Sequence, residues 1–328
     1  MQQLKCWSCK KDGYYSKLLK GGVVLAWALM SQSAMADDLR TWNEWHQEMG
    51  GYIEQMGERV DRFLGDETLE VTSKGNELRI YQPNRLYDNG DLESNLNVRI
   101  KFDLPKTEQR WRVVFSSFEE DLTEEGELEA INQTSEIVTE NERSTLTAQY
   151  FLNRDERSTA RLDFGMRFYD VTKLNPFARL RYRTGQMMGS KLYSRQTYNL
   201  VAERQDGFFA EAQQRFDFEL QGKQLLRSQS GVRVYAEQTE LNLRQTFALY
   251  QPVNSRNLMT YYADGQWVDT IHQALRTDYI ALGANWRHQF ALKWLFIELE
   301  PRMRWFDLRL TESEFSAMVK FEAQFYHQ

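Results

Sequence analysis

Beyond its first 36 residues, this chain has no long apolar run, no cysteine and few histidines. No run there reaches the about eighteen apolar residues that a transmembrane helix needs, so helical membrane spans are excluded. The two cysteines, Cys6 and Cys9, have no nearby histidine to complete a zinc site. The chain also has no excess of basic over acidic residues, since its formal net charge is −6. A nucleic-acid-binding protein is therefore not expected.

Groupings of residues typical of catalysis are missing as well. The four histidines are His46, His272, His288 and His327, and none lies in a His-x-Ser sequence. No Gly-x-Ser-x-Gly sequence prepares a serine nucleophile. We therefore expect no enzymatic activity, no cofactor and no metal site. An acidic stretch at 119–143 is expected to be a solvated loop, with a divalent-cation site as the weaker alternative.

The N-terminus has the three regions of an export signal. Lysines precede a short apolar core at 21–30, and Ala34-Met35-Ala36 fits the small-x-small cleavage rule. A membrane anchor is the alternative, but about ten apolar residues are too few to span a bilayer. We expect residues 1–36 to be cleaved, with Asp37 as the first mature residue.

Residues 38–65 have the periodicity of an amphipathic helix. Their apolar residues recur at steps of three and four and form one stripe. We expect a periplasmic helix and linker over 37–75. Four roles are open for this helix: it packs on its own protein, plugs a lumen, lies on a membrane surface or docks a periplasmic partner. The partner-binding candidates on the stripe are Trp42, Trp45, Ile53 and Phe63.

Residues 76–328 alternate apolar and polar side chains in runs of about ten, the period of β-strands. In the run from Ala317, apolar residues hold the odd positions as far as Phe325. The expected strands are 77–87, 94–104, 110–118, 144–153, 158–169, 177–186, 191–204, 208–220, 224–236, 240–251, 257–268, 276–288, 294–306 and 315–326. This pattern predicts fourteen antiparallel strands, or twelve if the weak runs near 77 and 257 are not strands.

Periodicity alone does not say which face meets water. In a soluble sandwich the apolar face would be internal, whereas in a membrane barrel it faces lipid. The export signal and the long series of strands favour an up-and-down barrel in the outer membrane of a Gram-negative bacterium. Aromatic residues near predicted strand ends, such as Trp111, Trp267 and Trp305, fit interfacial girdles. Outer-membrane lipid and the barrel-assembly machinery are the expected partners.

The polar face then becomes the barrel interior. Arg179, Arg181 and Arg183 alternate along one strand and project to one side. This strip either joins an ion-pair network that fills the lumen or selects anions in a pore. The lumen-lining candidates are Arg161, Arg167, Arg179, Arg181, Arg183, Arg195, Glu211, Arg215, Asp217, Glu219, Glu298, Glu300, Arg302 and Arg304.

Four short motifs follow one another along the chain. They are RFLGDE at 62–67, FDLPKTE at 102–108, PFARLR at 176–181 and WLFIELEP at 294–301. In these motifs the chain resembles a family of uncharacterised outer-membrane β-barrel proteins of gammaproteobacteria. The resemblance implies location and fold, without a substrate or catalytic residue. One departure is that Phe325-Tyr326 is followed by His327-Gln328, whereas assembly signals usually end on an aromatic residue.

Three functions follow from these patterns. The first is a narrow or gated channel for small polar or anionic solutes. The second is a structural or partner-binding barrel, with a lumen filled by ion pairs and a periplasmic docking helix. The third, for which no catalytic grouping argues, is an outer-membrane hydrolase.

Overall fold

The computed structural model describes most of the chain from residue 76 onward. The described ranges are 76–104, 110–117, 144–154, 157–170, 173–205, 207–221, 224–236, 240–270, 273–308 and 310–326. The expected signal segment 1–36, the expected helix at 38–65 with its partner-binding candidates, and the acidic stretch 119–143 lie outside these ranges. So do His46, His272 and His327.

The described ranges fold into β-strands joined mostly by short turns. The first eight are β1 (Glu77–Tyr87), β2 (Leu92–Ser94), β3 (Asn97–Leu104), β4 (Trp111–Ser116), β5 (Ser144–Arg154), β6 (Ser158–Asp170), β7 (Lys173–Met187) and β8 (Leu192–Glu203). The others are β9 (Gly207–Glu219), β10 (Leu225–Tyr235), β11 (Glu240–Asn254), β12 (Asn257–Thr270), β13 (Gln273–Gln289), β14 (Leu295–Trp305) and β15 (Ser313–Tyr326). Within these ranges, no helix is long and apolar enough to cross a membrane.

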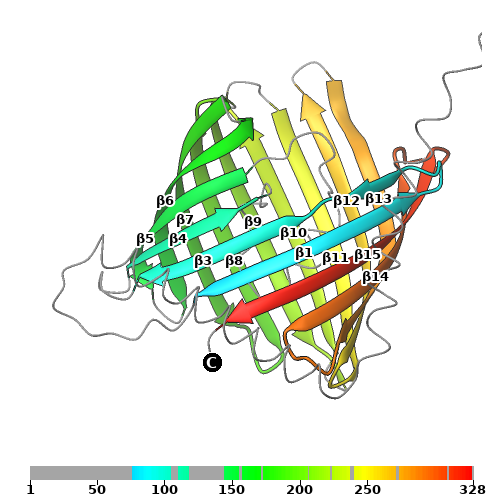
Figure 1. The fold of residues 1–328 in the computed structure, drawn as a ribbon. Helices are drawn as coiled ribbons and strands as arrows, with labels where there is room; N and C mark the ends of the chain where they lie inside the picture. Colours follow the sequence, from blue (N-terminus) through cyan, green and yellow to red (C-terminus); the bar gives the residue numbers. More distant parts are fainter. Residues whose placement is uncertain are drawn as a thin grey trace, which may run out of the picture. The chain divides into compact units, whose positions relative to one another are not determined.

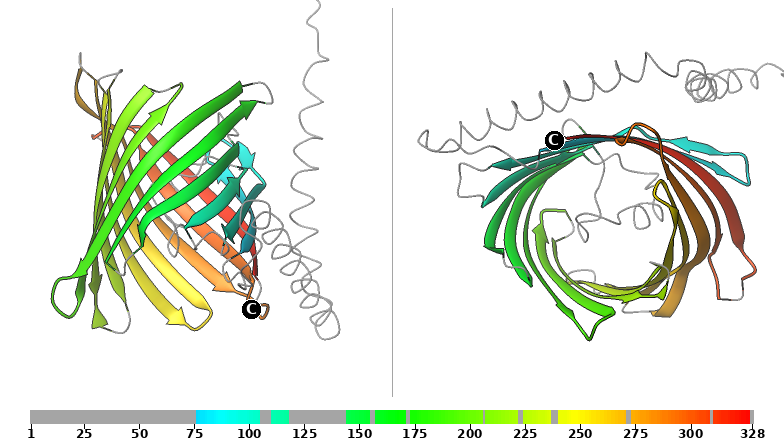
Figure 2. Two further views of the ribbon diagram at one scale, coloured as in Figure 1. Left: turned by 90° about the vertical axis from the view of Figure 1, so that its left-hand side faces the viewer. Right: turned by 90° about the horizontal axis from the view of Figure 1, so that it is seen from below.

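The strands form one closed antiparallel barrel (Figures 1 and 2). From β3 to β15, each strand pairs with the next one along the chain. β15 then returns to β1, and the two strands pair from Glu77↔Tyr326 to Tyr87↔Ser316. Closure pairs the strand that would otherwise be left at each edge of the sheet. The predicted all-β up-and-down barrel is confirmed.

β2 and β3 are two parts of one strand position in the wall. Both pair with β1 in the same register, so the 15 strands fill fourteen positions. The interruption lies opposite Pro83, whose carbonyl accepts a hydrogen bond from the Asn95 amide at 3.3 Å. Proline has no N–H to return the second bond of such a pair, so the ladder breaks there. The prediction of fourteen strands is confirmed, and both weak runs form strands, β1 and β12.

The alternation places polar side chains inside the barrel and apolar ones outside. The inner positions include Arg85, Asp163 and Glu298, whose side chains have no exposed surface. Outer positions include Phe164 and Phe208, with 50% and 65% of their surface exposed. A soluble sandwich would show the reverse. The apolar faces of the strands therefore point away from the barrel interior.

One apolar cluster on the outer side surrounds the closure of the barrel. Leu78 on β1 lies opposite Phe325 on β15, and both are buried. Phe102 and Leu104 from β3, together with Trp294 before β14, complete the cluster. The ring centroids of Trp294 and Phe325 are 5.5 Å apart. Apolar packing thus reinforces the hydrogen-bonded ladder that joins the two ends of the sheet.

Candidate functional site: the inner wall

The inner face of the barrel carries the densest set of charged groups in the described ranges. Strand pairing places all the lumen-lining candidates there: Arg161, Arg167, Arg179, Arg181, Arg183, Arg195, Glu211, Arg215, Asp217, Glu219, Glu298, Glu300, Arg302 and Arg304. Their positions follow from the period of two along each strand. Whether they line an open pore remains a prediction.

Asp163 on β6 lies between two arginines. The side chain of Arg179 on β7 donates from Nε to Oδ2 at 2.7 Å, and Nε of Arg161 lies 3.1 Å from Oδ1. Because Asp163 has no exposed side-chain surface, its charge requires these partners. One carboxylate here is shared between two cations.

A chain of polar contacts crosses the four strands from β7 to β10. Arg181 Nε donates to Asn199 Oδ1 at 2.9 Å, and Asn199 Nδ2 donates to Glu211 Oε2 at 2.9 Å. Arg233 on β10 forms an ion pair with the other oxygen of Glu211. The amide of Asn199 therefore links Arg181 to the carboxylate that Arg233 binds directly.

Asp217 on β9 has a similar environment. Arg227 on β10 donates to both of its oxygens, at 2.7 and 3.1 Å, and Arg215 Nη2 lies 2.9 Å away. This fork-to-fork contact fixes the Arg227 guanidinium in the wall. Again one carboxylate has two arginine partners.

Between β6 and β10 the described inner wall has more arginines than carboxylates. The arginines are Arg161, Arg167, Arg179, Arg181, Arg183, Arg195, Arg215, Arg227 and Arg233, and the carboxylates with described side chains are Asp163, Glu203, Glu211, Asp217 and Glu219. We call this part of the wall the arginine sector. It is cationic although the whole chain is acidic, at a formal −6.

Two pairs of arginines in this sector lie directly opposite each other. Arg161 on β6 faces Arg181 on β7, and Arg195 on β8 faces Arg215 on β9. Opposed like charges destabilise a strand pair unless carboxylates, water or dissolved anions screen them. The register therefore concentrates positive charge on one part of the inner wall.

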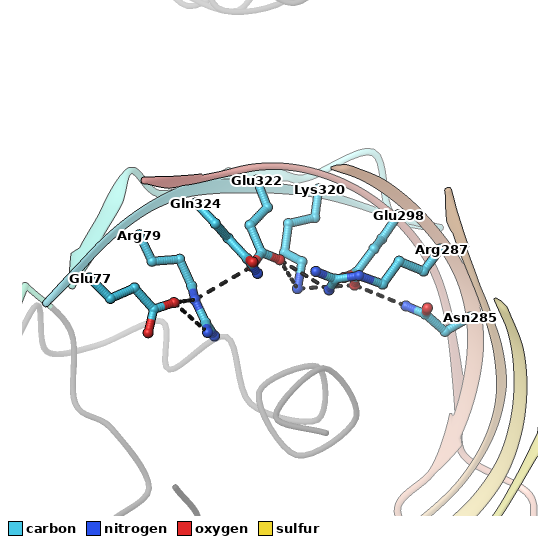
Figure 3. A network of polar contacts seen from close by, with 8 residues as sticks. All are labelled: Glu77, Arg79, Asn285, Arg287, Glu298, Lys320, Glu322 and Gln324. Atoms are coloured by element: carbon cyan, nitrogen blue, oxygen red, sulfur yellow. Dashed lines mark hydrogen bonds and ion pairs between the residues drawn. The ribbon is translucent and has the colours of Figure 1, made fainter. Parts of the chain in front are cut away.

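The wall near the closure is balanced by contrast. Figure 3 shows a network of Glu77, Arg79, Asn285, Arg287, Glu298, Lys320, Glu322 and Gln324 from β1, β13, β14 and β15. Lys320 Nζ lies 3.0 Å from Glu298 Oε2, and Arg287 Nη1 lies 3.1 Å from Glu322 Oε2. Three cationic side chains here meet three carboxylates, so this network carries no excess charge.

A second buried group near the closure links β1, β12, β14 and β15. Arg85 Nη2 lies 3.1 Å from Glu300 Oε1 and Arg85 Nη1 donates to Ser316 Oγ at 2.9 Å. The Tyr262 hydroxyl donates to the same Glu300 oxygen at 3.0 Å. Gly283, opposite Tyr262, leaves the space that the tyrosine ring occupies.

The ion pairs named above run along the wall. Each joins residues of one strand, of adjacent strands, or of strands separated by a single strand, as Arg85 and Glu300 are. The carboxylates of these pairs therefore lie beside the arginines, on the same strand or on a nearby one.

Several of these partners were not among the predicted site residues. Arg85, Arg227, Arg233, Arg287 and Lys320 all contact the predicted carboxylates. Their alternating positions could have identified them, because each lies on the polar face of its strand. Among the described residues, no group of His, Cys, Asp or Glu is arranged to hold a metal ion.

His288, one of the four histidines, lies on the outer face near the end of β13. Its Nδ1 is 2.9 Å from Asn257 Oδ1, and Trp286 Nε1 donates to the same oxygen at 3.1 Å. The rings of Trp286 and His288 stack with centroids 5.6 Å apart. This arrangement belongs to an aromatic cluster at a strand end, away from the charged inner wall.

Comparison with known proteins gives matches among solved structures. No model of a known protein family matches the sequence. No curated protein matches it either. Among solved structures, the chain is similar to the outer membrane channel DcaP of Acinetobacter baumannii, with 8% identity, 76% of this chain and 96% of that chain covered, and a TM-score of 0.45.

Two further solved structures are, by their titles, an outer membrane protein and a porin. OmpTdeltaL8, a loop L8 deletion mutant of an outer membrane protein of Vibrio cholerae, has 8% identity, covers 76% of this chain and 98% of that chain, and gives a TM-score of 0.42. KdgM porin in complex with disordered oligogalacturonate has 6% identity, with 75% of this chain and 98% of that chain covered, and a TM-score of 0.37. The barrel assignment itself rests on the strand pairing described above.

Proposed function

We propose that this protein is an outer-membrane channel that favours small anionic solutes. The observation that carries the proposal is the arginine sector, in which Arg195 and Arg215 lie directly opposite each other on the inner wall. Arginine and lysine side chains that line a pore attract anions and repel cations. A wall with more arginines than carboxylates would favour anions even in an acidic protein.

The membrane location is part of the same proposal. The outward positions carry exposed aromatic and aliphatic side chains, such as Phe247 at 50% and Leu200 at 58%. A closed barrel satisfies its backbone hydrogen bonds within the wall, so it can stand in hydrocarbon. An apolar outer face and a polar interior together characterise transmembrane barrels.

Electrical recording tests the channel directly. Purified protein in a planar bilayer should produce conductance steps. Under a KCl gradient, the reversal potential should have the sign that chloride permeation produces. A cation-selective reversal potential would contradict the anion preference. Silence of both the mature chain and a variant without residues 37–75 would overturn the channel itself.

A further inference from the structure

A row of polar side chains interrupts the apolar outer face of the barrel. Gln196 on β8, Gln214 on β9, Ser230 on β10 and Gln245 on β11 lie in direct register across four adjacent strands. The row continues to Gly265 on β12, which has no side chain. We call Gln196, Gln214, Ser230 and Gln245 the outer polar row.

The row points away from the arginine sector. Its members alternate with inner-face residues of the same strands: Gln196 follows Arg195, and Gln214 precedes Arg215. It lies within exposed apolar surface, with Tyr198 at 46% and Phe247 at 50% on its two sides. Ser230 stands in the middle of β10, five residues from either end. The row is therefore not part of an aromatic belt at the rim.

Some of the polar groups satisfy one another. Gln214 Nε2 donates to Ser194 Oγ at 3.0 Å, and Gln245 Nε2 donates to Ser228 Oγ at 3.2 Å. Ser230 Oγ donates to Gln245 Oε1 at 2.5 Å. The amide of Gln196 has no hydrogen-bond partner within the described ranges. A side-chain amide held against hydrocarbon without such a partner is unfavourable.

We infer that the outer polar row is the contact surface for a second copy of this chain within the membrane. The inference rests on the proposed membrane location. Amides and hydroxyls both donate and accept, so the row is complementary to itself across a two-fold axis. Lipid tails offer no hydrogen bonds, and lipid headgroups lie at the rims of the barrel rather than beside the middle of β10. Ala212, next to Gln214 on the outer face of β9, has a small side chain that lets a second wall approach closely, as small residues do between membrane helices.

Cysteine crosslinking tests this contact in cell membranes. The chain has no cysteine after Cys9, so Ser230→Cys introduces one thiol into the mature protein. Ala317→Cys is the matched control, because Ala317 is a small, exposed outer-face residue on β15. Mild oxidation should give at least tenfold more reducible dimer with Ser230→Cys than with Ala317→Cys. Equal yields, with both thiols shown to be present after unfolding, would overturn the inference.

A second variant separates association from folding. Gln214→Leu/Gln245→Leu should lower the dimer fraction at least fivefold in analytical ultracentrifugation, while the heat-dependent gel shift of a folded barrel persists. A monomeric wild-type protein, or a dimer that the double change leaves intact, would contradict the contact. Recordings on the same preparations distinguish the two proposals. Crosslinking without conductance would refute only the channel, and conductance without crosslinking would refute only the contact.

Discussion

Arg85 on β1 and Glu300 on β14 form a fully buried ion pair at 3.1 Å, although β15 lies between their strands. The pair spans the closure of the barrel and bridges residues 215 positions apart in the chain. Arg85→Met would leave the Glu300 carboxylate buried without this partner. We expect it to lower the free energy of unfolding by about 3–5 kcal/mol, the usual cost of breaking a buried pair.

Urea unfolding in lipid vesicles, followed by tryptophan fluorescence, measures this loss. Glu77→Gln is the control, because the Glu77–Arg79 pair is partly exposed and should be worth less than about 1 kcal/mol. Adding Glu300→Gln to Arg85→Met removes the uncompensated charge and should restore most of the stability. A double variant as unstable as Arg85→Met would show that the charge is not the cause.

Gly283 should not tolerate a methyl group. An added Cβ would lie 2.4 Å from the Tyr262 ring, which would have to move and strain its hydrogen bond to Glu300. We expect Gly283→Ala to destabilise the barrel by about 1–3 kcal/mol, as overpacking does. Gly231→Ala is the control, because its Cβ would meet only Gln213, at 3.7 Å. That change should be neutral or stabilising by up to about 1 kcal/mol.

Charge changes in the arginine sector should shift selectivity in opposite directions. Arg195→Gln removes one of two directly opposed cations and should shift the reversal potential in the direction of greater cation permeation. Asp217→Asn removes a carboxylate and should move it toward the anion side. Both effects should shrink in 1 M salt, where the Debye length falls to about 3 Å. Shifts in the same direction would exclude an electrostatic origin.

The export signal predicts a mature protein that begins at Asp37. Intact mass measurement of protein purified from membranes should match residues 37–328. Ala36→Pro, next to the cleavage site, should block processing and leave a larger precursor. A full-length mass for the wild-type protein would instead favour the membrane-anchor alternative.

Local pattern predicted much of this fold because strand geometry repeats every two residues. The run from Ala317 to Phe325 showed its two faces directly, and β15 has them. The broken ladder at β2 and β3 was not predicted, since it depends on Pro83 lying opposite Asn95. β7 begins at Lys173, four residues before the expected start at 177, because the chain continues its pairing with β6 through Pro176.

The charged residues of the inner wall were identified by periodicity, but their partners were not. Alternation gives a side chain its face, whereas its neighbours depend on the register between strands. Arg195 meets Arg215 rather than a carboxylate only because β8 and β9 pair as they do. The outer polar row was missed for the same reason, since its glutamines and serines are isolated from one another in sequence and aligned only across strands.

The sequence by itself determined a set of two-faced strands and the kind of side chain on each face. These properties depend on local backbone geometry and on the order of residues along a single strand. The tertiary structure alone decided where the barrel closes and which charges are opposed. Those outcomes depend on register, which accumulates from strand to strand and is fixed only when β15 pairs with β1.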